Sequence, residues 1–265
     1  MLPDPHDFDL SRLRAEANFG RLLYFDEVGS TQEEARRAVR EQEPRERLLV
    51  LARNQTLGRG RGENRWHAGP GALTFTWVLP AEELGIPAAE QPSASLAAAL
   101  GVVRLIEELG PTSEFGLKWP NDVYLGGRKL CGVLAERSGG RLLLGVGVNI
   151  NNRFDTAPPE VAREAVSLAE AIGRPFDLTE TLLAVLERIA RELEQLAAAD
   201  PEQASAWNEY SLLKNRRLTV VSARGPVEGR CREISADGAL HLETPTGPQR
   251  IFSGVVQQIE PPLAG

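Results

Sequence analysis

The chain has 265 residues, of which 42% are hydrophobic and 25% are charged, a composition typical of a globular protein with a buried core. Its net charge of -7 argues against a general affinity for nucleic acid, so no binding to DNA is expected. The cysteines, Cys131 and Cys231, stand far apart and the histidines do not cluster, which indicates neither a disulfide framework nor a zinc motif. Without a signal peptide or a long apolar run, we expect a cytoplasmic protein that does not enter the membrane.

The first part of the chain predicts a strand, a helix and a second strand. Leu22–Phe25 reads as a strand, and the later apolar run Leu48–Ala52 as another. Between them, Ser30-Thr31-Gln32-Glu33 matches a capping box, with Ser30 at the start of a helix that runs to about Arg40. Such a helix end also offers hydroxyls and free amides to a carbonyl or carboxylate ligand, so both roles stay open for Ser30.

A loop rich in glycine and arginine follows, from Gln55 to Trp66, with the sequence QTLGRGRGENRW. Glycine lets backbone amides come close to a ligand, and arginine forks match the geometry of carboxylates and phosphates. The next segment, Ala72–Leu79, predicts a strand because apolar and polar residues alternate along it: Leu73, Phe75 and Trp77 against Thr74 and Thr76. The loop is therefore held between two strands, either as a solvated basic turn or as a lid over an anionic small molecule.

The middle of the chain predicts a buried helix followed by a β-meander. The helix covers Ser93–Leu109, and GLKWPND then places Lys118 on a strand with a bend at Asn121-Asp122. Further strands are predicted over Leu130–Glu136 and Leu142–Ile150. Two glycines lie inside the last of these, and interior strand glycines mark places where a ligand comes close to the backbone.

The rest of the chain predicts helices and then a small β-domain. Residues 152–160 read as a proline-containing loop, and helices are predicted over Ser167–Ile172, Leu178–Ala198 and Ala204–Leu213. Short strands separated by turn residues follow, over Leu218–Val221, Val227–Ile234, Ala239–Glu243 and Arg250–Phe252. Their spacing indicates a small all-β barrel, so we divide the chain into domains at residues 1–214 and 215–265.

The candidate chemistry depends on charge more than on a nucleophile. Lys118 beside Trp119 is either a surface lysine lying along the indole or a point charge aimed at a carboxylate or phosphate. No Cys/His or Ser/His pair is apparent, which favours a reaction driven by positioning and charge neutralisation, such as attack of a carboxylate on a nucleotide α-phosphate. Trp66 offers an aromatic face for a base or anchors its loop in the core.

The order of these motifs resembles the biotin–protein ligases, or biotin–[acetyl-CoA-carboxylase] ligases, from about residue 22 to residue 260. The resemblance is carried by Ser30-Thr31, Gln55-x-x-GRGR-x(4)-Trp66, KWPND with GRKLCGVLAE, GVGVNIN and the small C-terminal domain. It implies an α+β fold with a class II-synthetase-like mixed sheet, helices and an SH3-like C-terminal β-barrel. It also implies that biotin and Mg-ATP form biotinyl-5′-AMP, from which a lysine of a biotin carboxyl carrier protein takes the biotin.

The resemblance also implies roles for individual residues. Biotin would be bound by Ser30, Thr31, Gln32, Gln55, Arg59, Gly60, Arg61, Lys118 and Gly132. ATP would be bound by Arg61, Arg65, Trp66 and Asn149. The catalytic charges would be those of Lys118, Arg59 and Arg61. Asp122 is suggested as the base or the neighbour of Mg²⁺, or as a brace for the Asn-Asp bend.

Two departures from the family pattern are visible. The family continues GRGR-x-G-R-x-W, whereas this chain has Glu63, Asn64 and then Arg65, so a phosphate contact at that place is in doubt. About 20 residues precede the first predicted strand, which is too few for a winged-helix DNA-binding domain, so we expect a ligase that is not a repressor. The sequence does not choose between a monomer and a homodimer.

Two other functions stay open. One is a lipoate or octanoate–protein ligase of the same superfamily, although the GRGR-x(4)-Trp66 loop and the C-terminal barrel are features of biotin ligases. The other is a protein without catalytic activity that binds single-stranded nucleic acid through the GRGR loop. The acidic net charge and the strands on either side of the loop oppose this second function.

Overall fold

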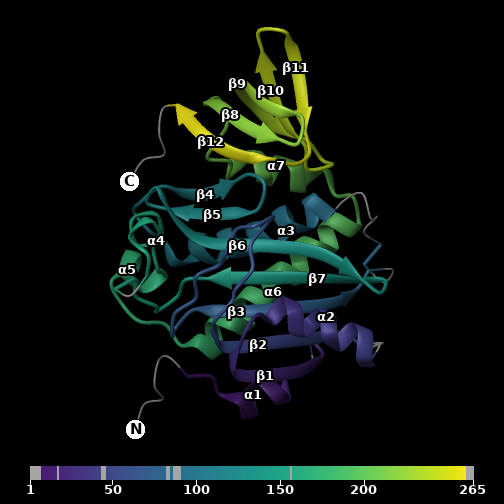
Figure 1. Cartoon of the computed structure of the whole chain (residues 1–265), viewed down its shortest axis with the longest axis vertical. Helices are drawn as coiled ribbons and strands as arrows, with labels where there is room; N and C mark the ends of the chain where they lie inside the picture. The colour runs from purple at the N-terminus through teal and green to yellow at the C-terminus, as the bar shows by residue number, and fades with distance from the viewer. Residues whose placement is uncertain are drawn as a thin grey trace. The chain divides into compact units, whose positions relative to one another are not determined.

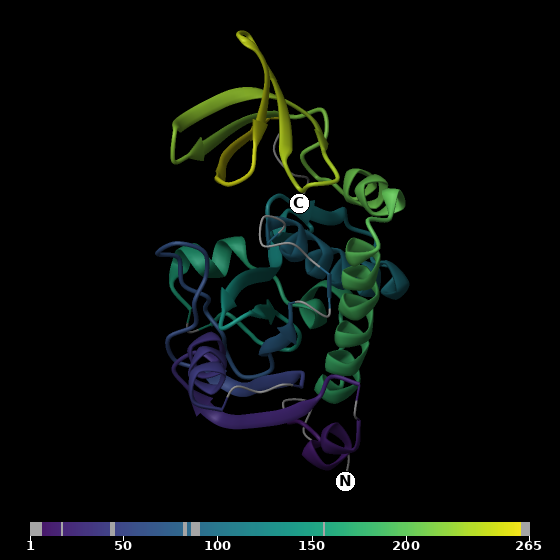
Figure 2. The same ribbon diagram turned by 90° about the vertical axis from the view of Figure 1, so that its right-hand side faces the viewer.

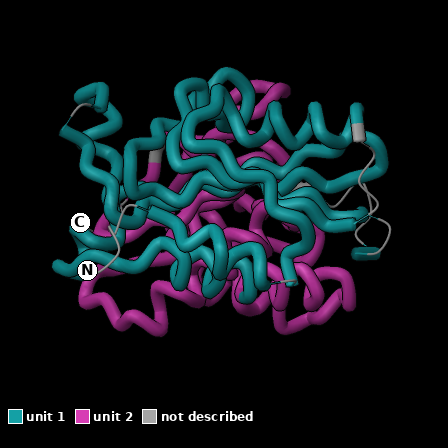
Figure 3. The backbone as a smooth tube through the Cα atoms, turned by 90° about the horizontal axis from the view of Figure 1, so that it is seen from below, with its two compact units in different colours: residues 1–85, 128–187 teal, residues 86–127, 188–265 magenta. Residues whose placement is uncertain are grey.

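The computed structural model describes residues 7–16, 18–42, 46–81, 84–85, 91–155 and 157–260. The chain divides into two compact units, shown in different colours in Figure 3. The first unit comprises residues 1–85 and 128–187, and the second comprises residues 86–127 and 188–265. Each unit is therefore built from two separate parts of the sequence.

The first unit is built on a mixed sheet with the strand order β1-β2-β3-β7-β6 (Figure 1). Only β1 and β2 run parallel, and the other neighbours are antiparallel. The strands are β1 Arg21–Val28, β2 Leu48–Gln55, β3 Leu73–Pro80, β6 Arg128–Ser138 and β7 Arg141–Val148. The helices that start in this unit are α1 Leu10–Ala15, α2 Thr31–Gln42, α4 Pro159–Glu164, α5 Leu168–Ile172 and α6 Leu178–Ala197.

Helices cover both faces of this sheet, and Figure 2 shows α2 and the first half of α6 on opposite sides of its strands. Under α2, a core forms from helix residues and every second strand residue: Ala35, Ala38, Val39, Leu48, Val50, Val78 and Leu143. The predicted apolar stripe of α6 is confirmed, since all of its members are buried: Leu182, Leu186, Ile189, Leu193 and Leu196. The whole of β3 is buried as a result, its threonines included.

The second unit contains α3 Gln91–Leu109, the antiparallel hairpin of β4 Phe115–Lys118 and β5 Asp122–Leu125, and α7 Pro201–Glu209. Its C-terminal part is a five-stranded antiparallel sheet with the order β11-β10-β9-β8-β12. These strands are β8 Arg217–Ser222, β9 Gly225–Ile234, β10 Leu240–Thr244, β11 Gly247–Ile251 and β12 Val255–Glu260. The predicted α+β class with a small C-terminal β-domain is confirmed, whereas the division at 214/215 stays a prediction.

Several boundaries differ from the predicted ones. The strand β12 was not predicted, because VVQQIE lacks the regular alternation that marks a strand, and its pairing with β8 contains an irregularity between Val256 and Gln258. Helix α4 starts within the segment read as a loop, since Pro159 suits a first helical turn. Helix α7 starts at Pro201 for the same reason, capped by Asp200. Among the described residues, no helix is both long and apolar enough to cross a membrane.

The two cysteines give a test of the core. Both Cys131 and Cys231 are free thiols with no exposed surface, and burial raises the pKa of the Cys231 thiol to about 12. We expect neither thiol to react with a disulfide reagent such as DTNB at pH 8, because both sulfur atoms are covered and the raised pKa of Cys231 also keeps that thiol protonated. Protein unfolded in urea serves as the control and should release both thiols rapidly. A fast-reacting thiol in the folded protein would contradict this packing.

Candidate active site

The glycine- and arginine-rich loop folds back on itself as a tight hairpin. Trp66 N donates to Gly58 O at 3.0 Å, and Gly60 N donates to Asn64 O at 2.8 Å. A Cβ at Gly58 would lie 2.4 Å from Trp66 O, so only glycine permits this approach. Gly62 has a φ of +62° and makes the turn at the tip. The loop therefore has a defined shape, and Trp66 is held at its return end.

A row of polar side chains lies where α2 begins. Thr31 donates from both its backbone N and its Oγ1 to Gln55 Oε1, at 2.8 and 3.2 Å. The hydroxyl of Thr76 lies 3.0 Å from Thr31 Oγ1 and 3.1 Å from Gln32 Oε1. The structure thus brings together Thr31, Gln32 and Gln55, which were predicted from the sequence, and adds Thr76 from β3. We name these four residues the polar row.

The predicted capping box is not formed. Ser30 Oγ is buried and makes no hydrogen bond with the described residues, so it does not cap α2. Gln55 takes that place, because its side chain accepts the free N–H of Thr31 at the first turn. A buried hydroxyl without a partner is uncommon, and Ser30 lies next to the polar row in sequence. Ser30 is therefore available to a ligand that can bond to its hydroxyl.

Beside this row, one face of the sheet is lined by small residues. The register pairs Thr76 with Gly145 on β7, and it aligns Thr74, Gly147 and Gly132 across β3, β7 and β6. Paired residues of neighbouring strands point to the same side, so these glycines form a continuous floor without side chains. We name Gly132, Gly145 and Gly147 the glycine floor. Gly145 and Gly147 are the two interior strand glycines that were predicted to let a ligand come close to the backbone, and both belong to this floor.

Protein side chains lie directly on the glycine floor. A Cβ at Gly145 would be 2.6 Å from Gln32 Oε1, and one at Gly147 would be 2.4 Å from Trp66 Cε2. A Cβ at Gly132 would be 3.4 Å from Trp66 Cζ3. Trp66 Nε1 is buried here and has no hydrogen-bond partner among the described residues. The indole of Trp66 and the side-chain amide of Gln32 therefore both lie against the glycine floor.

A lysine that sequence reasoning missed lies at the same end of the sheet. Lys129 Nζ is 5.9 Å from the centroid of the Trp66 ring and would be 3.3 Å from a Cβ at Gly132. Asn149 follows β7, and its side-chain amide donates to Lys129 O at 3.4 Å. Lys129 stands in the GRKLCG run, three residues before Gly132, so its place in the motif was the available signal. Four residues therefore lie close together at this end of the sheet: Trp66, Asn149, Gly132 and Lys129.

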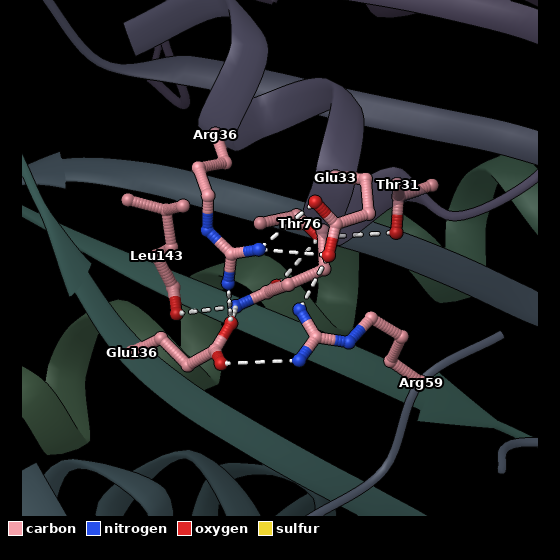
Figure 4. Close-up of polar contacts among 8 residues, drawn as sticks. Thr31, Glu33, Arg36, Arg59, Thr76, Glu136 and Leu143 are labelled. Atoms are coloured by element: carbon pink, nitrogen blue, oxygen red, sulfur yellow. Dashed lines mark hydrogen bonds and ion pairs between the residues drawn. The ribbon is translucent and has the colours of Figure 1, made fainter. Parts of the chain in front are cut away.

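The arginines of the loop differ in their surroundings. Arg59 donates to Glu33 on α2, and its Nη2 lies 3.7 Å from Glu136 Oε1 on β6 (Figure 4). Burial alone would raise the pKa of Glu33, but Arg36 and Arg59 outweigh it and hold that pKa below its ordinary value. Arg65 forms a backbone bridge with Arg59, and the side chain of Arg65 is exposed.

Two predicted residues, Lys118 and Asp122, lie in the second unit. Lys118 ends β4, and its Nζ is 3.1 Å from the Tyr124 hydroxyl and 4.7 Å from the centroid of that ring. Asp122 opens β5 and is the register partner of Lys118. Among the described residues, no three His, Cys, Asp or Glu side chains gather as a metal-binding group.

Together these features describe a site for a small molecule with a polar head and an anionic end. The polar row and Ser30 provide hydroxyl and amide groups, and the loop provides guanidinium groups. Residues 24–152, which contain both, match the Biotin/lipoate A/B protein ligase family. The fold and the site thus define an enzyme of the biotin and lipoate ligase class.

Individual relatives narrow the class. The biotin–[acetyl-CoA-carboxylase] ligase of Mycobacterium tuberculosis is 33% identical over 199 residues, 74% of this chain and 73% of that protein. The bifunctional ligase/repressor BirA of Bacillus subtilis is 29% identical over 253 residues, 92% of this chain and 76% of its own. The solved biotin protein ligase of Aquifex aeolicus in complex with biotin and ATP is 30% identical, with a TM-score of 0.77 covering 90% of this chain and 98% of that one. The chain belongs to the biotin protein ligase family.

The contact between Trp66 and Gly147 can be tested by a double-mutant cycle. Gly147→Ala should lower the free energy of unfolding by about 1–3 kcal/mol, because the new methyl group overlaps the indole. In a Trp66→Ala background the same substitution should cost much less, since all the nearest atoms belong to Trp66. Urea unfolding of the four proteins measures both effects. Equal costs in the two backgrounds would show that Trp66 does not rest on Gly147.

Proposed function

We propose that this chain attaches biotin to a lysine of a biotin carboxyl carrier protein, using ATP and passing through biotinyl-5′-AMP. The observation that carries the proposal is the arrangement of the polar row, the glycine floor and the arginine loop within one unit. The solved relative from Aquifex aeolicus holds biotin and ATP, which supports the same pair of small molecules here. Family membership supports the reaction type.

The polar row suits the ureido ring of biotin. A ureido group carries one carbonyl acceptor and two N–H donors, and these match hydroxyl and amide side chains. Ser30, whose buried hydroxyl has no hydrogen-bond partner in the described part of the chain, offers one such group, and Thr31, Gln32 and Gln55 offer others. Gly132 lies in the glycine floor on the next strand, where the lack of a side chain lets Trp66 and Lys129 come close to the backbone. We therefore assign the head of biotin to the polar row.

The loop suits the anionic part of the ligands. Arg59, Gly60 and Arg61 follow one another in the hairpin, so two guanidinium groups flank a residue without a side chain, whose own N–H is donated to Asn64 O. We assign them to the biotin carboxylate and the ATP phosphates, which such groups bind by charge-assisted hydrogen bonds. Arg65 is assigned to the phosphates with its side chain exposed, in a loop whose sequence differs there from the family pattern.

The adenine is assigned to Trp66 and Asn149, which lie at the same end of the sheet. An indole face stacks on a base for about 1–3 kcal/mol. Mg²⁺ would neutralise charge on the phosphates and would reach the site on them, since Mg²⁺ takes phosphates with one or two carboxylates. Asp122 is the carboxylate proposed for it.

The chemistry then needs positioning and positive charge. In the first step, a carboxylate oxygen of biotin attacks the α-phosphorus of ATP, the bond to the β-phosphate oxygen breaks, and pyrophosphate leaves. In the second, the neutral amine of the carrier lysine attacks the acyl carbon, AMP leaves with the bonding electrons, and the new amide loses a proton. Arg59, Arg61 and Lys118 are assigned to the charge that develops at phosphorus. Lys129, beside Trp66, is a further candidate.

The wider setting is proposed from the same resemblance. The carrier would be a subunit of acetyl-CoA carboxylase or of a similar carboxylase, as the name of the Mycobacterium tuberculosis relative, a biotin–[acetyl-CoA-carboxylase] ligase, implies for that protein. We propose a cytoplasmic location, and a ligase domain at residues 1–214 followed by an SH3-like domain at residues 215–265. A lipoate or octanoate ligase is the second candidate, because the matching family includes lipoate ligases.

The proposed reaction predicts a specific exchange. Radiolabelled pyrophosphate should enter ATP in the presence of biotin, because the adenylation step is reversible. Lipoate and octanoate should give little exchange under the same conditions. Addition of a carrier domain should then move labelled biotin onto one lysine. Exchange with lipoate alone would favour the second candidate, and a salt-sensitive RNA gel shift without any exchange would favour nucleic-acid binding.

The two lysines can be compared directly. Lys118→Ala and Lys129→Ala should each slow adenylate formation on the order of 100-fold if each stabilises the charge at phosphorus. Single-turnover formation of biotinyl-AMP measures this, and thermal unfolding shows whether each protein stays folded. Lys214→Ala, a lysine of the second unit with no proposed role, serves as the control. A lysine whose replacement leaves the rate at that of the wild type has no such role.

A further inference from the structure

Four charged side chains form a cluster beside the polar row, and Figure 4 shows them pointing toward one another. Arg36 on α2 donates from Nη1 to both oxygens of Glu33, at 2.7 and 2.9 Å, and from Nη2 to Glu136 Oε2 at 2.7 Å. Arg59 joins the same two carboxylates from the loop. Helix α2, strand β6 and the arginine loop therefore meet at this cluster.

Only one of the two carboxylates also contacts the polar row. Glu136 Oε2 accepts from Gln32 Nε2 at 2.8 Å, and Leu143 O accepts from the same nitrogen at 3.3 Å. Gln32 Oε1 then faces the hydroxyl of Thr76 at 3.1 Å. If the amide were turned over, its oxygen would face a carboxylate and a carbonyl, which repel it. Glu136 therefore fixes which end of the Gln32 amide points along the row.

Glu136 lies where it can hold the Gln32 amide in this orientation. The register pairs Glu136 with Leu143, and Leu134 and Gly132 on the same strand pair with Gly145 and Gly147. Glu136 thus stands on the same face as the glycine floor, one step beyond its end. Its side chain is 26% exposed, against 48% for Glu33. A partly buried carboxylate interacts more strongly with its partners than an exposed one.

We propose that Glu136 is a positioning residue for biotin, acting through Gln32. Its carboxylate holds the side-chain amide that is assigned to the ureido ring, and this contact distinguishes it from Glu33, which shares the two arginines. Glu136 is assigned no contact with biotin or with the reacting atoms. The inference rests on the proposed biotin ligase function.

The test compares the two carboxylates in the full-length protein. Glu136→Gln keeps the size of the side chain, removes its charge and places an NH₂ group beside Gln32 and Arg36. We expect the KM for biotin in the exchange reaction to rise about ten-fold or more, the scale of a lost charge-assisted hydrogen bond. The KM for ATP and kcat should change less than about three-fold, because Glu136 acts through Gln32, which is assigned to biotin.

Glu33→Gln is the matched control. It removes the other carboxylate of the same two arginines, but Glu33 is more exposed, and within the described part of the chain Gln32 donates to Glu136 and not to Glu33. Its KM for biotin should stay within about three-fold of the wild type, as is usual for exposed ion pairs. Equal effects of Glu33→Gln and Glu136→Gln would overturn the inference, because a general loss of negative charge would then explain both.

A second cycle tests the route through Gln32. In a Gln32→Met background, Glu136→Gln should raise the KM for biotin much less than in the wild type, since the amide it orients is gone. Equal effects in both backgrounds would overturn the inference. If Glu136→Gln fails to fold, Glu136→Asp keeps the charge on a shorter side chain and should raise the same KM by a smaller factor. If the wild type is active and the variants have unchanged kinetics, this inference is wrong and the proposed function stands. If the wild type shows no biotin-dependent exchange, the proposed function is wrong.

Discussion

The lack of side chains at three positions on one face of the sheet is the constraint on which the site depends. Gly132, Gly145 and Gly147 come from two neighbouring strands, and the antiparallel register brings them together. Any side chain at Gly145 or Gly147 would collide with Gln32 or Trp66. The glycines weaken the strands locally, and the burial of their neighbours on the opposite face offsets this cost. A rigid sheet can therefore carry a polar site on one of its faces.

The arginine loop beside this floor carries positive charge, whereas the protein as a whole carries negative charge. The chain carries a net charge of -7, yet the loop presents Arg59, Arg61 and Arg65 within seven residues. In the structure, carboxylates of α2 and β6 lie against Arg59. These pairs hold a flexible side chain in one place, which reduces the conformational entropy that a ligand must remove. An acidic protein can thus bind an anionic ligand at one prepared location.

The fold was largely predictable because its elements carry strong local patterns. The alternation in Ala72–Leu79 and the apolar stripe of Leu178–Ala198 both became the expected strand and helix. The interpretation of polar positions was harder. Thr76 alternates with apolar residues in the way of a surface threonine, but it is buried and faces Thr31 and Gln32. Ser30 matches a capping signal, whereas Gln55, 24 residues after Thr31, accepts the N–H of Thr31.

The sequence by itself determined the element order, the family resemblance and three residues of the polar row, Thr31, Gln32 and Gln55, because short motifs and periodic patterns are written in adjacent residues. Only the tertiary structure decided how these residues combine. The strand register placed Gly132 opposite Gly147, the loop hairpin laid Trp66 on both, and the contacts of α2 with β6 joined Gln32 and Arg36 to Glu136. Glu136 and Lys129 lie in the GRKLCGVLAE run, but their contacts are with partners that are 100 and 63 positions away in the chain. Such pairings depend on register and packing, which one sequence does not state.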